Sequence, residues 1–264
     1  RNASIYRALV TGPDRLTVQL DEGRHVRDYY ERAEKRGQPL EVTLNNGVGS
    51  ATSKSSDVSI EINADGVDDG GDPDTLTHAG GTLYGGNSPL SIIQHGSETL
   101  SLGAMSASNT SSLSIEADEG VTLTTSPTAD KFFSFTINAD ADADGTGAYN
   151  GTGVTLNPSE EASITITTGG NPVLGTLRTD SSNTNPVADQ ITVNFTSPTA
   201  TINSAAVFQT NGKDVNLRAY DDLTIGSSGS LTYERSMGAI DMRALRITAD
   251  YNALAGADFV VEAA

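Results

Sequence analysis

The sequence predicts an all-β protein built from sandwich- or barrel-like modules, with one short amphipathic helix near the N-terminus. Composition is the first observation: of 264 residues, 5% are aromatic and none is Trp, and the chain leans on residues that suit strands and turns. Alternation is the second, because the apolar residues of segment 163–167 (SITIT) occupy every second position and so predict one buried face. Turn residues that recur at intervals of about 8 to 12 positions are the third, and this spacing is typical of a sandwich or barrel.

An echo between two stretches of the chain suggests an internally duplicated β unit. Segment 59–65 (SIEINAD) returns as 134–140 (SFTINAD), and segment 125–129 (TSPTA) returns unchanged as 196–200. Matches in the same order at nearly the same offset favour duplication, while the alternative is chance in a Ser/Thr/Asn-rich chain. The predicted domains are a near-neutral base from residues 1–54 plus 205–264, a first acidic β module at 57–129 and a second at 130–204.

Local patterns place the individual strands. Segments 4–10 and 15–20 are predicted strands on either side of a turn sequence, and Asn211-Gly212 predicts a tight hairpin between strands at 205–210 and 213–219. Further short strands are predicted at 40–44, 57–63, 90–94, 99–102, 112–116, 121–124, 131–138, 153–157, 162–168, 190–195, 222–226, 230–234, 242–249 and 259–261.

The predicted helix spans about residues 22–36. Its apolar side chains recur at helical spacing and form one face, which is a candidate for contacts between subunits. Asp21 can cap the start of the helix, and Gly37 ends it. The residues of the candidate assembly contact are Val26, Tyr29, Tyr30 and Ala33.

Charge is distributed unevenly along the chain. The net charge is −18, yet residues 1–54 carry 9 basic and 7 acidic side chains, whereas residues 55–210 carry 2 basic and 19 acidic ones. A strongly acidic middle repels nucleic acid and anionic membranes, so assembly contacts are expected in the terminal segments. The acidity fits a halophilic or marine source, or a calcium-rich milieu, and it equally fits an acidic mesophilic surface protein.

Two further absences exclude classes of protein. The sequence has no Cys, which excludes disulfides, thiolate catalysis and Cys-type zinc sites. No stretch approaches the roughly 18 to 20 apolar residues that a membrane helix needs, so membrane insertion is not expected.

The sharpest local motif is a candidate calcium loop at Asp140, Asp142 and Asp144, followed by Gly145. Carboxylates at alternate positions with a glycine at the sixth wrap a hard cation in oxygen ligands. Position 12 is Gly151, so the bidentate Glu of an EF-hand is missing. Thr146 could add a backbone carbonyl, and Asn138 or Asn150 a side-chain oxygen. The alternative is a solvated acidic turn.

A weaker ion site is predicted where the first echo ends. Asp65, Asp68 and Asp69 begin a run that is rich in aspartate, and such a run repels itself unless a cation or salt intervenes. Its spacing is less regular, and a hydrated loop is the alternative reading.

Catalytic patterns find little support. The three histidines are His25, His78 and His95, and none belongs to a zinc-hydrolase pair or a nucleophile motif. The sparse aromatic content also argues against a sugar-stacking groove. The sequence therefore predicts no enzyme, no catalytic residue and no cofactor other than a candidate calcium ion.

The predicted function is a non-enzymatic structural subunit of an ordered extracellular or virion assembly, such as a tail, capsid or decoration protein, or a surface-layer or filament subunit. Its expected partners are copies of itself and other structural subunits, located outside the cell, at the cell surface or in a virion. The alternative is a calcium-dependent adhesin or receptor-binding β module, and a hydrolase is the third reading.

Overall fold

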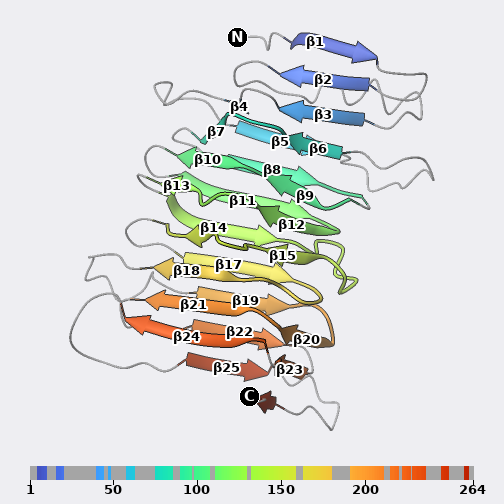
Figure 1. Cartoon of the computed structure of the whole chain (residues 1–264). Helices are drawn as coiled ribbons and strands as arrows, with labels where there is room; N and C mark the ends of the chain where they lie inside the picture. Colours follow the sequence, from blue (N-terminus) through green and yellow to red (C-terminus); the bar gives the residue numbers. More distant parts are fainter. Residues whose placement is uncertain are drawn as a thin grey trace.

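In a computed structural model, the strands of this chain stack in parallel, turn upon turn, to form a β-solenoid (Figure 1). Every secondary-structure element among the described residues is a strand, and these residues include no helix. The structure describes residues 5–10, 16–20, 40–44, 47–48, 58–62, 75–85, 90–96, 98–107, 111–129, 132–158, 163–179, 191–210, 215–219, 222–226, 228–235, 245–249 and 259–261.

The longest sheet has eight strands and takes one strand from each successive turn. Leu90 pairs with Leu113, 23 residues later, and Ile164 pairs with Ile191, 27 residues later. Because a full turn of chain separates neighbouring strands, they run in parallel and do not form hairpins. In spatial order the strands are β25 (Leu245–Ala249), β22 (Val215–Ala219), β19 (Ile191–Phe195), β17 (Ser163–Thr168), β14 (Phe132–Asn138), β11 (Ser111–Ala117), β8 (Leu90–Gln94) and β5 (Val58–Ile62).

A seven-stranded sheet forms the second wall of the solenoid. Its first pair, β1 with β2, is antiparallel, and the remaining strands of this sheet follow in parallel. Its strands are β1 (Ile5–Val10), β2 (Leu16–Leu20), β3 (Leu40–Leu44), β6 (Thr75–His78), β9 (Leu100–Leu102), β12 (Gly120–Leu123) and β15 (Ala148–Asn150).

Three smaller parallel sheets complete the walls. One has β13 (Thr128–Ala129), β10 (Ala104–Ala107), β7 (Thr82–Gly85) and β4 (Gly47–Val48). Another has β16 (Thr155–Leu156), β18 (Gly175–Thr179), β21 (Ala205–Thr210) and β24 (Ser230–Arg235). The last has β20 (Thr199–Ile202), β23 (Asp222–Ile225) and β26 (Phe259–Val261).

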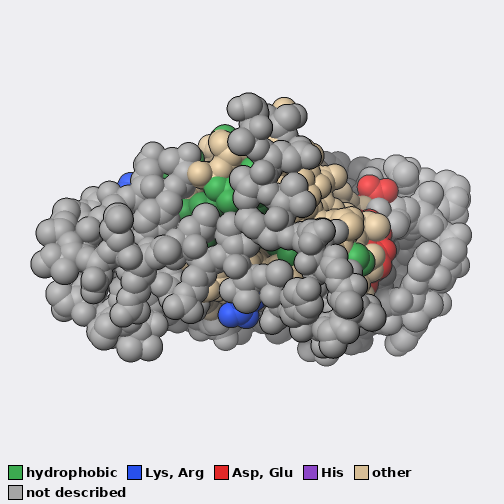
Figure 2. Space-filling model, turned by 90° about the horizontal axis from the view of Figure 1, so that it is seen from below, with side chains coloured by type: hydrophobic (Ala, Val, Ile, Leu, Met, Phe, Trp, Pro, Cys, Tyr) green, Lys and Arg blue, Asp and Glu red, His purple; other side chains and the backbone are tan. Residues whose placement is uncertain are grey.

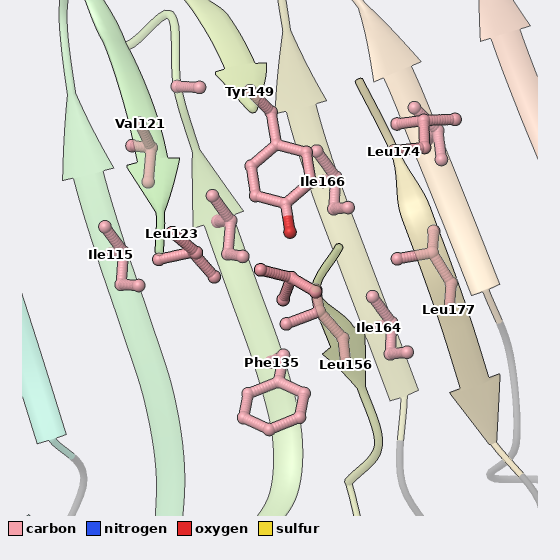
Figure 3. Close-up of a cluster of buried hydrophobic side chains, with 14 of the residues drawn as sticks. Ile115, Val121, Leu123, Phe135, Tyr149, Leu156, Ile164, Ile166, Leu174 and Leu177 are labelled. Atoms are coloured by element: carbon pink, nitrogen blue, oxygen red, sulfur yellow. The ribbon is translucent and has the colours of Figure 1, made fainter. Parts of the chain in front are cut away.

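Apolar side chains fill the interior between the walls. Strand β17 alternates half-buried hydroxyl residues with buried Ile164 and Ile166, as the sequence pattern requires. Figure 3 shows such side chains from facing strands meeting inside the solenoid. Full burial of a side chain of this size contributes about 1.5 to 3 kcal/mol. Strand pairing stacks one row of buried residues along the axis: Ile92, Ile115, Ile137, Ile166, Val193 and Leu217.

Tyr149 is an exception inside this apolar interior. The residue is fully buried, and its hydroxyl has no hydrogen-bond partner among the described residues. Burial raises the pKa of the Tyr149 phenol. A Cβ atom at Gly151 would lie 2.5 Å from that hydroxyl oxygen, so this glycine makes the room that the phenol occupies.

Replacing Tyr149 with phenylalanine is expected to raise the free energy of unfolding by about 1 kcal/mol. The change removes a buried polar atom without a partner, and such an atom costs about 1 to 3 kcal/mol to desolvate. Urea denaturation of the two proteins measures the difference. A destabilised Tyr149→Phe protein would show that the hydroxyl has a hydrogen-bond partner in solution.

The prediction of a sandwich or barrel was wrong. Alternating burial occurs in any strand with one buried and one solvated face, so it does not separate a sandwich from a solenoid. The predicted hairpin at Asn211-Gly212 was also wrong, because β21 pairs with β18 and β24 whereas β22 pairs with β19 and β25.

The prediction of a duplicated β unit was also wrong, because the element that repeats along the chain is a single turn of the solenoid. Ile60 pairs with Ile92, Ile92 pairs with Ile115, and Ile115 pairs with Ile137, so the strand register aligns Ile60 with Ile137. The sequence echo had instead aligned Ile60 with Phe135, two residues earlier. The two TSPTA copies lead into β13 and β20, which belong to different sheets. The boundaries predicted for a base domain and two acidic modules are not tested by these pairings and stay a prediction.

Two other sequence predictions concern helices. The predicted helix at 22–36, with its contact residues Val26, Tyr29, Tyr30 and Ala33, lies outside the described residues. Within the described ranges, no helix has the length and apolar character needed to cross a membrane.

Candidate metal centre

The acidic motif forms a corner between the eight-stranded and the seven-stranded sheets. Strand β14 ends at Asn138 and β15 begins at Ala148, so all three aspartates lie on the connection. Backbone hydrogen bonds continue the stacking through this corner. The Ala139 N–H donates to the Thr167 carbonyl at 2.8 Å, and the Ala141 N–H donates to the Ala117 carbonyl at 3.0 Å. The turns on both sides therefore hold the loop.

Asp140 is buried and accepts hydrogen bonds from three groups. Its Oδ2 accepts the Gly145 N–H at 3.1 Å and the Thr196 hydroxyl, and its Oδ1 accepts the Gly147 N–H at 3.4 Å. The side chain is only 1% exposed. A carboxylate taken out of water needs such donors, because an uncompensated buried charge is strongly destabilising. Asp140 is therefore part of the framework of the corner.

Asp142 and Asp144 are exposed and make local turns. The Asp144 Oδ1 accepts the Thr146 N–H at 2.8 Å and the Thr146 hydroxyl at 2.7 Å, while the Asp142 Oδ1 accepts the Asp144 N–H at 3.4 Å. The two bonds from backbone N–H groups are of the Asx type, and the bond from the Thr146 hydroxyl joins two side chains. Ala143, between the two aspartates, has a φ of 57°, a left-handed conformation that is unusual for a residue with a side chain.

The three carboxylates converge. One carboxylate oxygen from each of Asp140, Asp142 and Asp144 lies within 4.8 Å of the others. Partial desolvation raises the pKa of Asp142, and repulsion from Asp144, Asp118 and Asp140 adds to the rise. Hydrogen bonds from the Thr146 hydroxyl and N–H lower the pKa of Asp144. The arrangement offers oxygen ligands to a hard cation such as Ca²⁺.

The raised pKa of Asp142 predicts a pH-dependent cost to stability. A carboxyl whose pKa is higher in the folded state destabilises the fold above that pKa, and the penalty disappears as the pH falls through it towards the ordinary value of 3.8. Without calcium, Asp142→Asn is therefore expected to be more stable than the parent at pH 7 and equal to it below pH ~3.8. Thermal melts across this range measure the difference, and a variant less stable at pH 7 would contradict the prediction.

The loop also depends on close backbone contacts. A Cβ atom at Gly147 would lie 2.0 Å from the Ala139 carbonyl oxygen and 2.2 Å from that of Asp118. A Cβ atom at Gly169, on the following turn, would lie 2.4 Å from the Gly145 carbonyl carbon. The acidic corner is therefore packed between the corners of its neighbouring turns, with backbone against backbone.

Other residues predicted for ion sites have different positions. Asp65, Asp68 and Asp69 lie outside the described residues. The Asn150 Oδ1 accepts the N–H and the hydroxyl of Thr152, so it is engaged in a turn of its own. The Asn138 Oδ1 is buried and has no hydrogen-bond partner among the described residues.

Sequence reasoning missed the groups that reach the loop from other turns. Thr196 donates to Asp140 from 56 positions away, and the Thr146 hydroxyl lies 3.3 Å from the Glu119 Oε2 of the preceding turn. The sequence feature that could have revealed these contacts is the position of the residues relative to the strands. Strands of the eight-stranded sheet end just before Asp118, Asp140 and Thr196. In the space-filling view of Figure 2, the described acidic side chains that are visible gather at one flank of the molecule.

Comparison with known proteins concerns the other end of the chain. Residues 1–68 match the model of the family described as UbiD, 3-octaprenyl-4-hydroxybenzoate carboxy-lyase Rift-related domain. The chain is 45% identical over 65 residues to the anhydromevalonate phosphate decarboxylase of Methanothermobacter thermautotrophicus. That match covers 25% of the chain and 15% of the relative. No solved structure matches the chain.

A second relative is similar over a shorter stretch. It is described as an uncharacterized protein in the cooM 5′ region of Rhodospirillum rubrum, and it is 55% identical over 49 residues, which cover 19% of the chain and 11% of the relative. The chain thus spans about a seventh or less of the length of the curated relatives it matches.

These similarities correct the functional prediction. The prediction of a non-enzymatic structural subunit, with its virion and capsid setting, was wrong, because the family model that matches residues 1–68 describes a carboxy-lyase and the 45% identical relative is named a decarboxylase. The adhesin alternative and the hydrolase reading are set aside on the same ground. The near-neutral N-terminal segment had been assigned to subunit assembly on its charge and on the apolar face of its predicted helix, and neither feature distinguishes a subunit contact from a segment of an enzyme.

Proposed function

We propose that this chain takes part in decarboxylation, with residues 1–68 serving as its carboxy-lyase-related segment. The observation that supports the proposal is the family match over these residues, together with the 45% identity to a named decarboxylase. The remaining residues, which continue into the solenoid, act as a rigid support for that segment.

Charge distribution agrees with an anionic substrate at the N-terminal end. The printed names of the family and the relative refer to a 4-hydroxybenzoate and to a phosphate of anhydromevalonate, which are negatively charged acids. Residues 1–54 carry 9 basic and 7 acidic side chains, and residues 55–68 add four acidic ones, so the matched segment is near neutral, whereas the residues that follow are strongly acidic. A field of this kind favours approach of an anion at the N-terminal segment over the solenoid wall.

The fold joins the matched residues to the rest of the chain through three sheets, because β3 pairs with β6, β4 with β7 and β5 with β8. Strand β3, which lies within the matched residues, pairs in parallel with β6 of the solenoid through Val42 opposite Leu76. The seven-stranded sheet therefore runs from the matched segment into the solenoid without interruption. A segment anchored in this way has a rigid base, which binding sites require.

Release of CO₂ by the full-length chain tests the proposal. Two probes follow the printed names: a 3-prenylated 4-hydroxybenzoate and anhydromevalonate phosphate. We expect one of them to bind and to lose CO₂. Replacing Arg24, Arg27 and Arg32 with glutamine is expected to weaken binding by removing positive charge, whereas Asp142→Asn, in the solenoid, serves as the control and is expected to leave it unchanged. Absence of both binding and CO₂ release with both probes would overturn the proposal.

Calcium binding at Asp140, Asp142 and Asp144 is a second, separate proposal for the acidic corner. The convergence of one oxygen from each carboxylate within 4.8 Å favours it. A bound ion stabilises the folded state by about 2.7 kcal/mol at a hundredfold excess over Kd. Calcium is therefore expected to raise the melting temperature of the parent protein but not that of a protein with Asp142→Asn and Asp144→Asn. Equal melting temperatures with and without calcium would contradict it.

The expected homo-oligomer, the contacts with other structural subunits and the extracellular location are not tested by these observations and stay predictions.

A further inference from the structure

A histidine lies at the same corner of the solenoid, on turns that precede the acidic loop. His95 directly follows β8, and Asp118 directly follows β11, so stacking brings them together. The His95 Nδ1 lies 3.0 Å from the Asp118 Oδ1, and the Gly96 N–H donates to the other oxygen of Asp118 at 2.9 Å. Because a carboxylate accepts hydrogen bonds, the neutral form of this ring places its proton on Nδ1, and Nε2 is then the nitrogen that offers a lone pair.

The other nitrogen of that ring lies near a second carboxylate. The His95 Nε2 lies 3.8 Å from the Glu116 Oε1, and the two side chains are 25% and 40% exposed. Asn138 is paired with Glu116 on the neighbouring strand β14. Its Oδ1 is buried and lacks a hydrogen-bond partner among the described residues. Strand pairing thus places Asn138 beside Glu116, whose carboxylate lies near the His95 ring, on three successive turns.

We propose that His95 and Glu116 bind a divalent transition-metal ion of the zinc class, with the Asn138 amide oxygen as the additional ligand group. Imidazole nitrogen is a ligand for Zn²⁺, Ni²⁺ and Cu²⁺, whereas Ca²⁺ and Mg²⁺ take oxygen ligands. A zinc ion lies about 2.0 to 2.2 Å from such nitrogen and oxygen ligands. One ion can therefore reach two atoms that are 3.8 Å apart.

Asp118 is the positioning residue of this site. A histidine that binds a metal usually donates its other N–H to a carboxylate, which fixes the tautomer and the orientation of the ring. The hydrogen bond from the Gly96 N–H fixes Asp118 in turn. The site is chemically distinct from the corner at Asp140, because that corner offers only oxygen atoms.

Titration of the full-length chain with Zn²⁺, followed by calorimetry, tests the proposal, and Co²⁺ gives a visible absorption band that reports on the ligands. We expect saturable binding that His95→Ala abolishes and that Glu116→Gln weakens. Asp118→Asn is expected to weaken zinc affinity by about 10- to 100-fold and to shift the Co²⁺ band, which a purely structural role would not do. An excess of Ca²⁺ is expected not to displace the zinc.

Matched controls separate this site from other metal-binding groups. His78→Ala removes a histidine whose Nδ1 accepts the Gly103 N–H at 2.9 Å on another part of the solenoid, and His25→Ala removes the third histidine. Neither change is expected to alter zinc affinity. Glu116→Gln, at a partly exposed position, is the readout if His95→Ala fails to fold. Absence of saturable zinc binding in the parent, or affinity unchanged by both His95→Ala and Glu116→Gln, would overturn the proposal, whatever the outcome of the decarboxylation assay.

Discussion

Replacing Gly147 with alanine is expected to lower the free energy of unfolding by about 3 kcal/mol or more. The new Cβ would meet the carbonyl oxygens of Ala139 and Asp118 at 2.0 and 2.2 Å, distances at which atoms overlap. Both obstacles are backbone atoms, so no flexible side chain can turn aside. The corner must open, and opening it disturbs the stacking of two turns. Urea denaturation followed by circular dichroism measures the loss.

Gly153→Ala is the matched control for this change. A Cβ atom at Gly153 meets nothing within 4 Å, although its φ of 70° disfavours a side chain. Its cost is therefore limited to backbone strain of about 1 to 2 kcal/mol. If Gly147→Ala costs no more than Gly153→Ala, the close packing of the corner does not exist in solution.

Much of the secondary structure was predictable, because it depends on neighbours in sequence. The alternation that buries Ile164 and Ile166 is visible in the sequence and gives the correct face of β17. The tertiary arrangement was not predictable from the same pattern. Whether Ile164 pairs across a hairpin or with Ile191 on the next turn depends on contacts 27 residues apart, and the alternation is the same in both cases.

The candidate site was predictable in part for the same reason. The spacing of Asp140, Asp142 and Asp144 indicated a loop that gathers carboxylates, and the structure does bring them together. The sequence could not show that Asp140 is buried, or that its carboxylate accepts a hydrogen bond from the hydroxyl of Thr196, two turns further along. Likewise, His95 belongs to no recognisable sequence motif, because its partner Asp118 is 23 residues away and becomes a neighbour only when the turns stack.

Asp140→Ala is expected to destabilise the protein by about 3 to 5 kcal/mol, even when no calcium is present. The change leaves the N–H groups of Gly145 and Gly147 and the hydroxyl of Thr196 without their acceptor. Hydrogen bonds to a charged group contribute about 1.5 to 3 kcal/mol each, and a donor left buried without a partner costs its desolvation. Thr196→Val, which removes one of the three donors, is expected to cost less than Asp140→Ala.

Asp142→Ala tests whether the effect belongs to burial or to the ion. Asp142 has the same carboxylate on the same loop but is exposed, so its loss without calcium is not expected to destabilise the fold. Asp142→Ala is expected to lower stability only when calcium is present. If Asp140→Ala behaves in the same way, then Asp140 acts as an ion ligand, and its hydrogen bonds to the three donors do not stabilise the corner. If Asp140→Ala is costly in a chelator and Asp142→Ala is not, the buried carboxylate holds the corner together and any bound cation adds to a loop that is already formed.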